Sequence, residues 1–156
     1  MTKLILDAIS RAFGGDPANG GNAKVFKTTN SGNNWILVDS TGGTNGFFNG
    51  VLFSKTNPQF GIAFSDPPSG PGNPYFILKT SNGGNNWISQ SSGTTKSLYC
   101  VSFTDVNHGS AVGSNGTILR TTDGGTNWML QSGGITNSLY GVSFPDIHNG
   151  KAVGPD

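Results

Sequence analysis

The sequence has no glutamate, one cysteine and two arginines among its 156 residues. Cys100 alone excludes an intrachain disulfide and a cysteine-based zinc cage. The net charge of +1, with 11% charged residues, argues against a nucleic-acid-binding surface and against a polybasic membrane anchor. No run approaches the roughly 18 apolar residues of a membrane helix, so we expect no membrane insertion.

The residues that are abundant indicate frequent turns. The chain contains 25 glycines and 8 prolines, and 10% of its residues are aromatic. Glycine supplies the backbone conformations that tight turns need, and the aromatic side chains supply apolar surface for the intervening strands to bury. The composition therefore favours an all-β protein over a helical one.

An internal repeat organises the chain. Residues 77–115 align with residues 118–156 without a gap, at an offset of 41 residues that places Trp87 on Trp128. A third copy, "VFKTTNSGNNWILVDS" at 25–40, places Trp35 52 residues before Trp87. Self-similarity at this period indicates a repeat architecture, in which each copy is one supersecondary unit.

Each repeat is expected to form four short strands. Residues 97–105, 109–114, 117–122 and 128–132 have the alternation or the β-branched character of strands, with turn residues between them. Four strands in about 41 residues is the period of a β-propeller blade. We therefore predict an all-β fold, a partial β-propeller of about 3.5 four-stranded antiparallel blades. Its parts are an abbreviated blade at 1–41, blades at 42–93 and 94–134, and a half blade at 135–156.

An arc of this kind has unpaired strand edges at both ends. A closed ring needs at least four blades, so we expect the terminal strands to pair with another chain. The alternatives are a fragment of a longer propeller, a subunit whose copies complete one another, and an arc that lies against another protein. The expected partners are therefore a second copy or another protein.

One motif in the repeat resembles a known family. Thr121, Asp123, Gly125 and Trp128 fit the Asp-box of bacterial neuraminidase repeats, and the longer unit around them is similar to the propellers of photosystem II assembly factors and their relatives in secreted bacterial proteins. The resemblance implies a propeller and, with the composition, an extracellular or periplasmic bacterial setting. The corresponding residues in the other copies are Thr28, Asn30, Gly32, Trp35, Thr80, Asn82, Gly84 and Trp87.

The box is interpreted as a structural turn. A side-chain oxygen at its third position can accept backbone N–H groups, while the glycines supply positive φ and the tryptophan supplies apolar surface. Two of the three copies have Asn in place of Asp. Because calcium requires several carboxylate oxygens, this substitution argues against a metal site. We expect neither a metal nor a cofactor.

Two loops that differ between repeats are candidates for a binding face. The resemblance implies that the functional face lies opposite the box, on the loops between the second and third strands. In this sequence these are the proline-containing loops 14–22 and 65–75, which ordinary surface insertion also explains. The candidate residues, including aromatic side chains suited to a glycan, are Asp16, Asn19, Asp66, Asn73, Tyr75, Phe47 and Phe48.

The sequence favours a noncatalytic role. The resemblance to sialidases implies three arginines and a glutamate paired with a tyrosine, and this chain has two arginines and no glutamate. A glycosidase that works with two carboxylates could use only Asp16 and Asp66. His108 and His148 are expected to be turn residues. The leading hypothesis is a scaffold that binds proteins or itself, the alternative is a glycan-binding propeller, and a hydrolase is the least favoured.

Overall fold

The computed structural model describes residues 24–40, 48–65 and 77–156. Within these ranges the chain forms twelve β-strands in four antiparallel sheets and one single-turn 3-10 helix, η2, at Ser114–Gly116. The predicted all-β class is therefore confirmed for the described part of the chain. Most of the abbreviated blade at 1–41 lies outside it, and the predicted blade boundaries stay a prediction.

Two of the sheets have four strands connected in sequence order. The first contains β3 (Phe48–Phe53), β4 (Gly61–Ser65), β5 (Ile77–Thr80) and β6 (Ile88–Gln90). The second contains β7 (Leu98–Phe103), β8 (Gly109–Gly113), β9 (Ile118–Thr121) and β10 (Met129–Gln131). These last four agree closely with the strands expected from the alternation, because each lies between two turn sequences.

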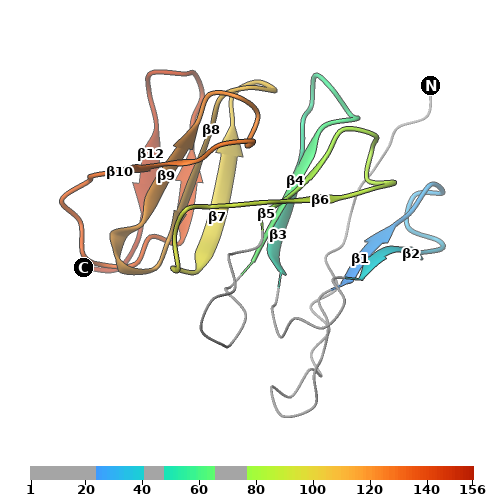
Figure 1. Ribbon diagram of the computed structural model, residues 1–156, viewed down its shortest axis with the longest axis horizontal. Coiled ribbons are helices and arrows are strands. Elements are labelled where there is room, and N and C mark those ends of the chain that lie inside the picture. The colour runs from blue at the N-terminus through green and yellow to red at the C-terminus, as the bar shows by residue number, and fades with distance from the viewer. Residues whose placement is uncertain (1–23, 41–47, 66–76) are drawn as a thin grey trace, which may run out of the picture.

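The other two sheets have two strands each. One pairs β1 (Lys24–Lys27) with β2 (Ile36–Ser40), and the other pairs β11 (Gly141–Ser143) with β12 (Lys151–Val153). By the repeat, β1 and β2 correspond to the third and fourth strands of a blade, whereas β11 and β12 correspond to the first and second. Figure 1 shows the β1–β2 hairpin on one side of the β3–β6 sheet and strands β7 to β12 on the other.

The main core lies between the two four-stranded sheets. Phe60, Ile62 and Phe64 from the first sheet and its turn pack with Leu119 and Trp128 of the second, each at most 8% exposed. Full burial of one such side chain stabilises the fold by about 1.5–3 kcal/mol. A smaller cluster of Phe48, Ala63 and Leu78 contacts Val38 of β2 and so joins the hairpin to the first sheet.

An aromatic ring covers a glycine between the first two strands of both four-stranded sheets. Phe103 lies directly opposite Gly109, and a Cβ on that glycine would lie 2.5 Å from the ring. The same pair recurs as Phe53 opposite Gly61. The glycine is therefore required by the close approach of the ring.

We predict that Gly109→Ala lowers the free energy of unfolding by about 1–3 kcal/mol, because the added methyl group overpacks the site. Urea unfolding followed by circular dichroism measures the loss. Adding Phe103→Leu to this variant should recover part of it, since the smaller side chain vacates the space. A double variant whose losses simply add would contradict this explanation.

Candidate interaction surface

Three equivalent turns connect the third strand of a sheet to the fourth. These Thr-Trp turns are residues 28–35, 80–87 and 121–128. In the last one, Thr121 Oγ1 accepts the N–H groups of Asp123 and Gly125 at 3.3 and 2.9 Å. Asp123 Oδ1 in turn accepts the Thr121 hydroxyl at 2.9 Å and the N–H of Asn127 at 2.9 Å. One hydroxyl and one side-chain oxygen thus close the whole turn.

Asparagine closes the other two turns in the same way. Asn82 Oδ1 accepts the hydroxyl of Thr80 and the N–H of Asn86, both at 3.0 Å. Asn30 Oδ1 makes the corresponding contacts with Thr28 and Asn34 at 3.0 and 2.9 Å. Because an amide oxygen replaces a carboxylate without loss of these bonds, the negative charge is not what holds the turn.

The tryptophans of the three turns have different surroundings. Each of the last two meets a phenylalanine edge to face, Trp128 with Phe103 at 6.0 Å and Trp87 with Phe53 at 5.8 Å. Trp128 is 8% exposed and donates its indole N–H to the Gly125 carbonyl at 3.1 Å. The buried indole N–H of Trp87 has no partner, and Trp35 is 37% exposed.

A basic residue directly before each threonine reaches the next repeat. Lys27 Nζ donates to Asn85 Oδ1 at 2.7 Å, and Lys79 Nζ donates to Thr126 Oγ1 at 3.0 Å. The two acceptors occupy equivalent positions in successive Thr-Trp turns. Arg120 is the third basic residue of this series, and its guanidinium donates to the Ile147 carbonyl at 3.4 Å. The sequence signal for this link is a basic residue at the same repeat position.

The Thr-Trp turns of the two four-stranded sheets also dock on the turn between the first two strands of their own sheet. The N–H of Gly83 donates to the Gln59 carbonyl at 2.9 Å, and the N–H of Gly124 donates to the Asn107 carbonyl at 2.8 Å. Both glycines have positive φ, 67° and 68°. By the repeat, the carbonyl that corresponds to Asn107 in the β11–β12 sheet is that of His148.

The β11–β12 turn has no docked Thr-Trp turn among the described residues, unlike the corresponding turns of the two four-stranded sheets. Asp146 keeps the β11–β12 turn in place, because its Oδ1 accepts the N–H groups of His148 and Asn149, both at 2.8 Å. Hydrogen bonds from Asn149, then from the His148 N–H, lower the pKa of Asp146. A shallow cavity of about 480 Å³ lies at this turn, lined by Ser143, Pro145, His148, Asn149, Gly150 and Lys151.

Strand β12 is exposed where the equivalent strands are buried. Every residue of β4 and β8 is buried, whereas every residue of β12 is exposed, with Val153 at 64%. Within the described residues β12 pairs only with β11. Among the residues that the structure describes, the other edge of β12 is therefore unpaired.

The backbone of Ala152 points to this open edge. Thr104 N–H donates to the His108 carbonyl, so Thr104 and His108 form a hydrogen-bonded pair between β7 and β8. Hydrogen-bonded and non-hydrogen-bonded pairs alternate along an antiparallel ladder, and Val101 and Ala111 therefore form a non-hydrogen-bonded pair. Ala111 accordingly directs its N–H and C=O away from β7 and toward β9. Ala152 occupies the equivalent position in β12, opposite Val142. Its N–H and C=O accordingly face away from β11.

The interface between the second four-stranded sheet and β11–β12 is more polar than the preceding one. His108 and Ser110 stand at the repeat positions of Phe60 and Ile62. They border a pocket of about 10 Å³, room for about one water molecule. The pocket is lined by Ser102, Thr104, His108, Gly109, Ser110, Arg120, Phe144 and Ile147.

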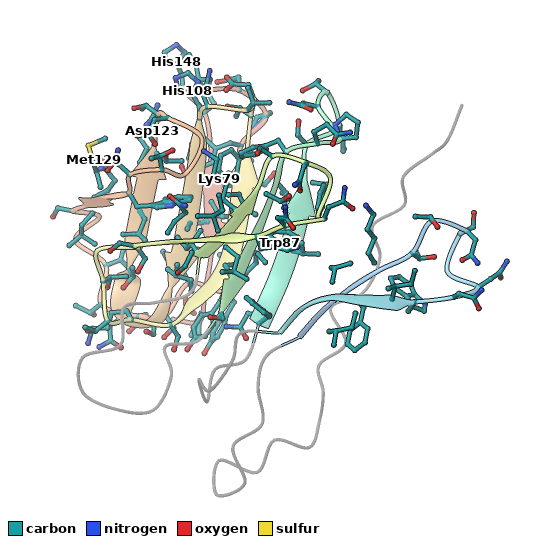
Figure 2. All side chains as sticks on the ribbon, turned by 45° about the vertical axis from the view of Figure 1, so that its right-hand side comes forward. Lys79, Trp87, His108, Asp123, Met129 and His148 are labelled. Atoms are coloured by element: carbon teal, nitrogen blue, oxygen red, sulfur yellow. The ribbon has the colours of Figure 1, made fainter. Side chains whose placement is uncertain are left out.

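The histidines are turn residues, as predicted. Asp105 accepts the backbone N–H of His108 at 2.9 Å and contacts its Nδ1 at 2.8 Å. The N–H groups of Asn107 and His108 lower the pKa of Asp105. No group of three metal-ligating side chains occurs within the described ranges. Figure 2 shows His108, Asp123 and His148 at the same end of the sheets, which is the end that carries the Thr-Trp turns.

One predicted binding residue is placed differently by the structure. Phe48 was expected to be an exposed aromatic, but it is 4% exposed, because it packs with Ala63 of β4 and Leu78 of β5. That expectation was wrong. Asp16, Asn19, Phe47, Asp66, Asn73 and Tyr75 lie outside the described residues, so their role stays a prediction.

Known proteins with this architecture are propellers. A family model described as "Photosynthesis system II assembly factor YCF48" matches residues 80–147. The chain superposes on a structure of YCF48 bound to D1 peptide with a TM-score of 0.60 and 22% identity, over 77% of this chain and 38% of the other. The chain has the β-propeller fold. It is a partial propeller, and its sheets are blades.

A second solved structure gives the same result. YCF48 from Cyanidioschyzon merolae matches with a TM-score of 0.57 and 20% identity, over 71% of this chain and 35% of the other. The chain thus spans little more than a third of the length of these relatives. No curated protein matches it. No helix among the described residues has the length and apolarity to span a membrane.

We predict that Thr121→Val lowers the free energy of unfolding by about 1–3 kcal/mol, because the buried N–H of Gly125 loses its acceptor. Thermal unfolding against the wild type measures the loss. Thr122→Val is the matched control, since Thr122 is exposed and adjacent. Equal losses in the two variants would contradict a specific role for the Thr121 hydroxyl.

We also predict that Asp123→Asn reduces the acid sensitivity of the fold. Hydrogen bonds from Asn127 lower the pKa of Asp123 from 3.8 to about 2. A lowered folded-state pKa means that the charged form stabilises the fold above about pH 4 and that this contribution disappears as the pH falls toward about 2. The measurement is the Tm of both proteins across this range. Identical pH profiles would contradict the prediction.

Proposed function

We propose that this chain is a noncatalytic propeller scaffold that binds protein segments, and that the open edge of β12 is a contact site. The observation that carries the proposal is the exposure of all three β12 residues, where the equivalent strands of complete blades are buried. The Ala152 N–H and C=O on this edge offer main-chain hydrogen bonds to an added strand. The shallow cavity at the β11–β12 turn offers room for side chains of such a segment.

A relative supports protein binding as the general role. The structure of YCF48 bound to D1 peptide is that of a propeller with the same kind of blade. The two loops predicted from the sequence, 14–22 and 65–75, are a second proposed contact surface. A noncatalytic role agrees with the absence of glutamate and the presence of only two arginines in the whole chain.

The Thr-Trp turns are inferred to be the Asp-boxes of this scaffold, with a structural role alone. Their polar atoms bond to one another, and their threonines are at most 1% exposed. The inferred setting is outside the cytoplasm of a bacterium, which the resemblance to secreted repeats and the composition suggest. A glycan-binding role remains a proposal for the two loops, although the burial of Phe48 removes one of its candidate stacking residues.

We expect a fluorescently labelled D1 peptide to bind the chain saturably in a fluorescence anisotropy titration. Ala152→Pro removes the N–H that faces the open edge and should raise the Kd about tenfold. Ala152→Val retains that N–H and is the matched control, with a Kd close to that of the wild type.

Two results would contradict parts of this proposal. If the proline variant binds the peptide as well as the wild type does, β12 is excluded as the contact site, and the loops 14–22 and 65–75 remain as the proposed surface. No saturable binding by the wild type would reject peptides of this kind as ligands. A glycan array then separates lectin-like binding from protein binding.

A further inference from the structure

We propose that a row of residues at the starts of the first strands, centred on the stacked Tyr99 and Tyr140, binds a proline-rich peptide segment. The inference rests on the proposed role in binding protein segments, but it adds a site separate from β12 and names the chemistry of the partner. Three observations support it: a bulge that recurs at one repeat position, the stacking of the two rings, and the neutrality of the row.

The first strand of each complete blade contains a β-bulge at its second residue. The extra residue is Asn49 in β3 and Tyr99 in β7, because the register of each strand shifts across it. Tyr140 occupies the same repeat position, immediately before β11. A bulge re-aims the side chain of its extra residue, and bulges are over-represented beside functional sites. We call Asn49, Tyr99 and Tyr140 the bulge row.

The bulge row lies at the end of the sheets opposite the Thr-Trp turns. Strands β7 and β9 run in the same direction, because both are antiparallel to β8. A Thr-Trp turn follows the end of β9, whereas Tyr99 is near the start of β7. The first strands of successive sheets also contact one another, β3 with β7 and β7 with β11. The row therefore continues across three sheets, at the end for which the sequence resemblance predicts a functional face.

Direct contacts join the members of the row. Asn49 Nδ2 donates to the carbonyl of Leu98, the residue before Tyr99, at 2.8 Å. The rings of Tyr99 and Tyr140 stack, with centroids 5.1 Å apart and planes inclined by 22°. Tyr140 is 59% exposed, and Tyr99 stays partly exposed although described strands flank β7 on both sides. The accessible aromatic surface therefore belongs to the pair and not to one residue.

The phenol groups of the pair are suited to an extended peptide. Among the described residues, no hydrogen bond involves the hydroxyl of Tyr99 or of Tyr140. A polyproline II segment has no internal hydrogen bonds, so its carbonyl oxygens can accept donors from a partner. Its proline rings are apolar and dock on aromatic surfaces. Stacked tyrosines supply both the apolar surface and the donors.

The neutrality of the row favours a proline-rich partner over an acidic or phosphorylated one. Amide and phenol groups make up the whole row. Recognition of phosphate or of acidic motifs relies on arginine clusters, which this row does not contain. A polyproline II segment is neutral and already ordered before it binds, so it loses little conformational entropy on a preorganised aromatic pair.

Fluorescence anisotropy with fluorescein-labelled decaproline tests the proposal. The wild type should bind saturably, and Tyr140→Ala should raise the Kd about tenfold, because half of the aromatic pair is lost. Tyr140→Phe keeps the ring but removes the donor, so the Kd should rise by a smaller factor. Ile88→Ala is the matched control, because Ile88 is 64% exposed on β6, outside the row. Melting curves establish that each variant is folded.

Nitration by tetranitromethane locates the bound peptide. Tyr140 is exposed and should be nitrated in the free protein. Saturating decaproline should reduce the nitration of Tyr140 and Tyr99, measured by mass spectrometry of peptides. A glycine-serine peptide of equal length should give no protection, because it has neither proline rings nor a preformed helix. Unchanged nitration in the presence of bound decaproline would place the peptide elsewhere and overturn the assignment.

Other results would also overturn the inference. These are the absence of saturable decaproline binding, and a Kd of Tyr140→Ala equal to that of the wild type. Protection of the tyrosines by cellohexaose but not by decaproline would assign the row to a sugar and reject the peptide. None of these results affects the contact at β12, which the Ala152 variants test with the D1 peptide. Conversely, decaproline binding without D1 peptide binding would support the bulge row and reject the D1 peptide as a ligand.

Discussion

A buried threonine hydroxyl fixes the third-to-fourth turn of each blade, and the contacts between blades depend on that turn. Thr121 is fully buried, and its Oγ1 accepts two backbone N–H groups while its hydrogen is donated to Asp123. The turn then presents Trp128 to the neighbouring core and Thr126 to a lysine of the preceding blade. One local interaction therefore sets both the apolar and the polar contacts across an interface.

Much of this arrangement could be predicted from the sequence. The period of 41 residues and the alternation within it gave the strands, because both are local patterns. The structural interpretation of the turn also agrees with the structure, since Asn and Asp make equivalent bonds. The substitution of Asn for Asp in two copies indicates that the bonds that close the turn do not require a carboxylate.

Other features depend on how blades lie beside one another, which a single repeat does not show. The hydrogen bond from Lys79 to Thr126 joins residues 47 positions apart. The sequence indicates it only through a basic residue that recurs at the same position of each repeat. Phe48 was expected to be an exposed aromatic that could stack on a glycan, yet it is buried in a cluster with Ala63 and Leu78. The polar interface at His108 and Ser110 likewise becomes visible only when those residues are compared with the buried Phe60 and Ile62.

The intrinsic fluorescence of the three tryptophans can report on the environments of three different turns. They occupy one repeat position, but Trp128 is buried and hydrogen-bonded, Trp87 has a buried indole N–H without a partner, and Trp35 is 37% exposed. Indole emission depends on contact with water and on hydrogen bonding at the N–H. The same side chain in three environments therefore divides the fluorescence of the protein into components, each belonging to one blade.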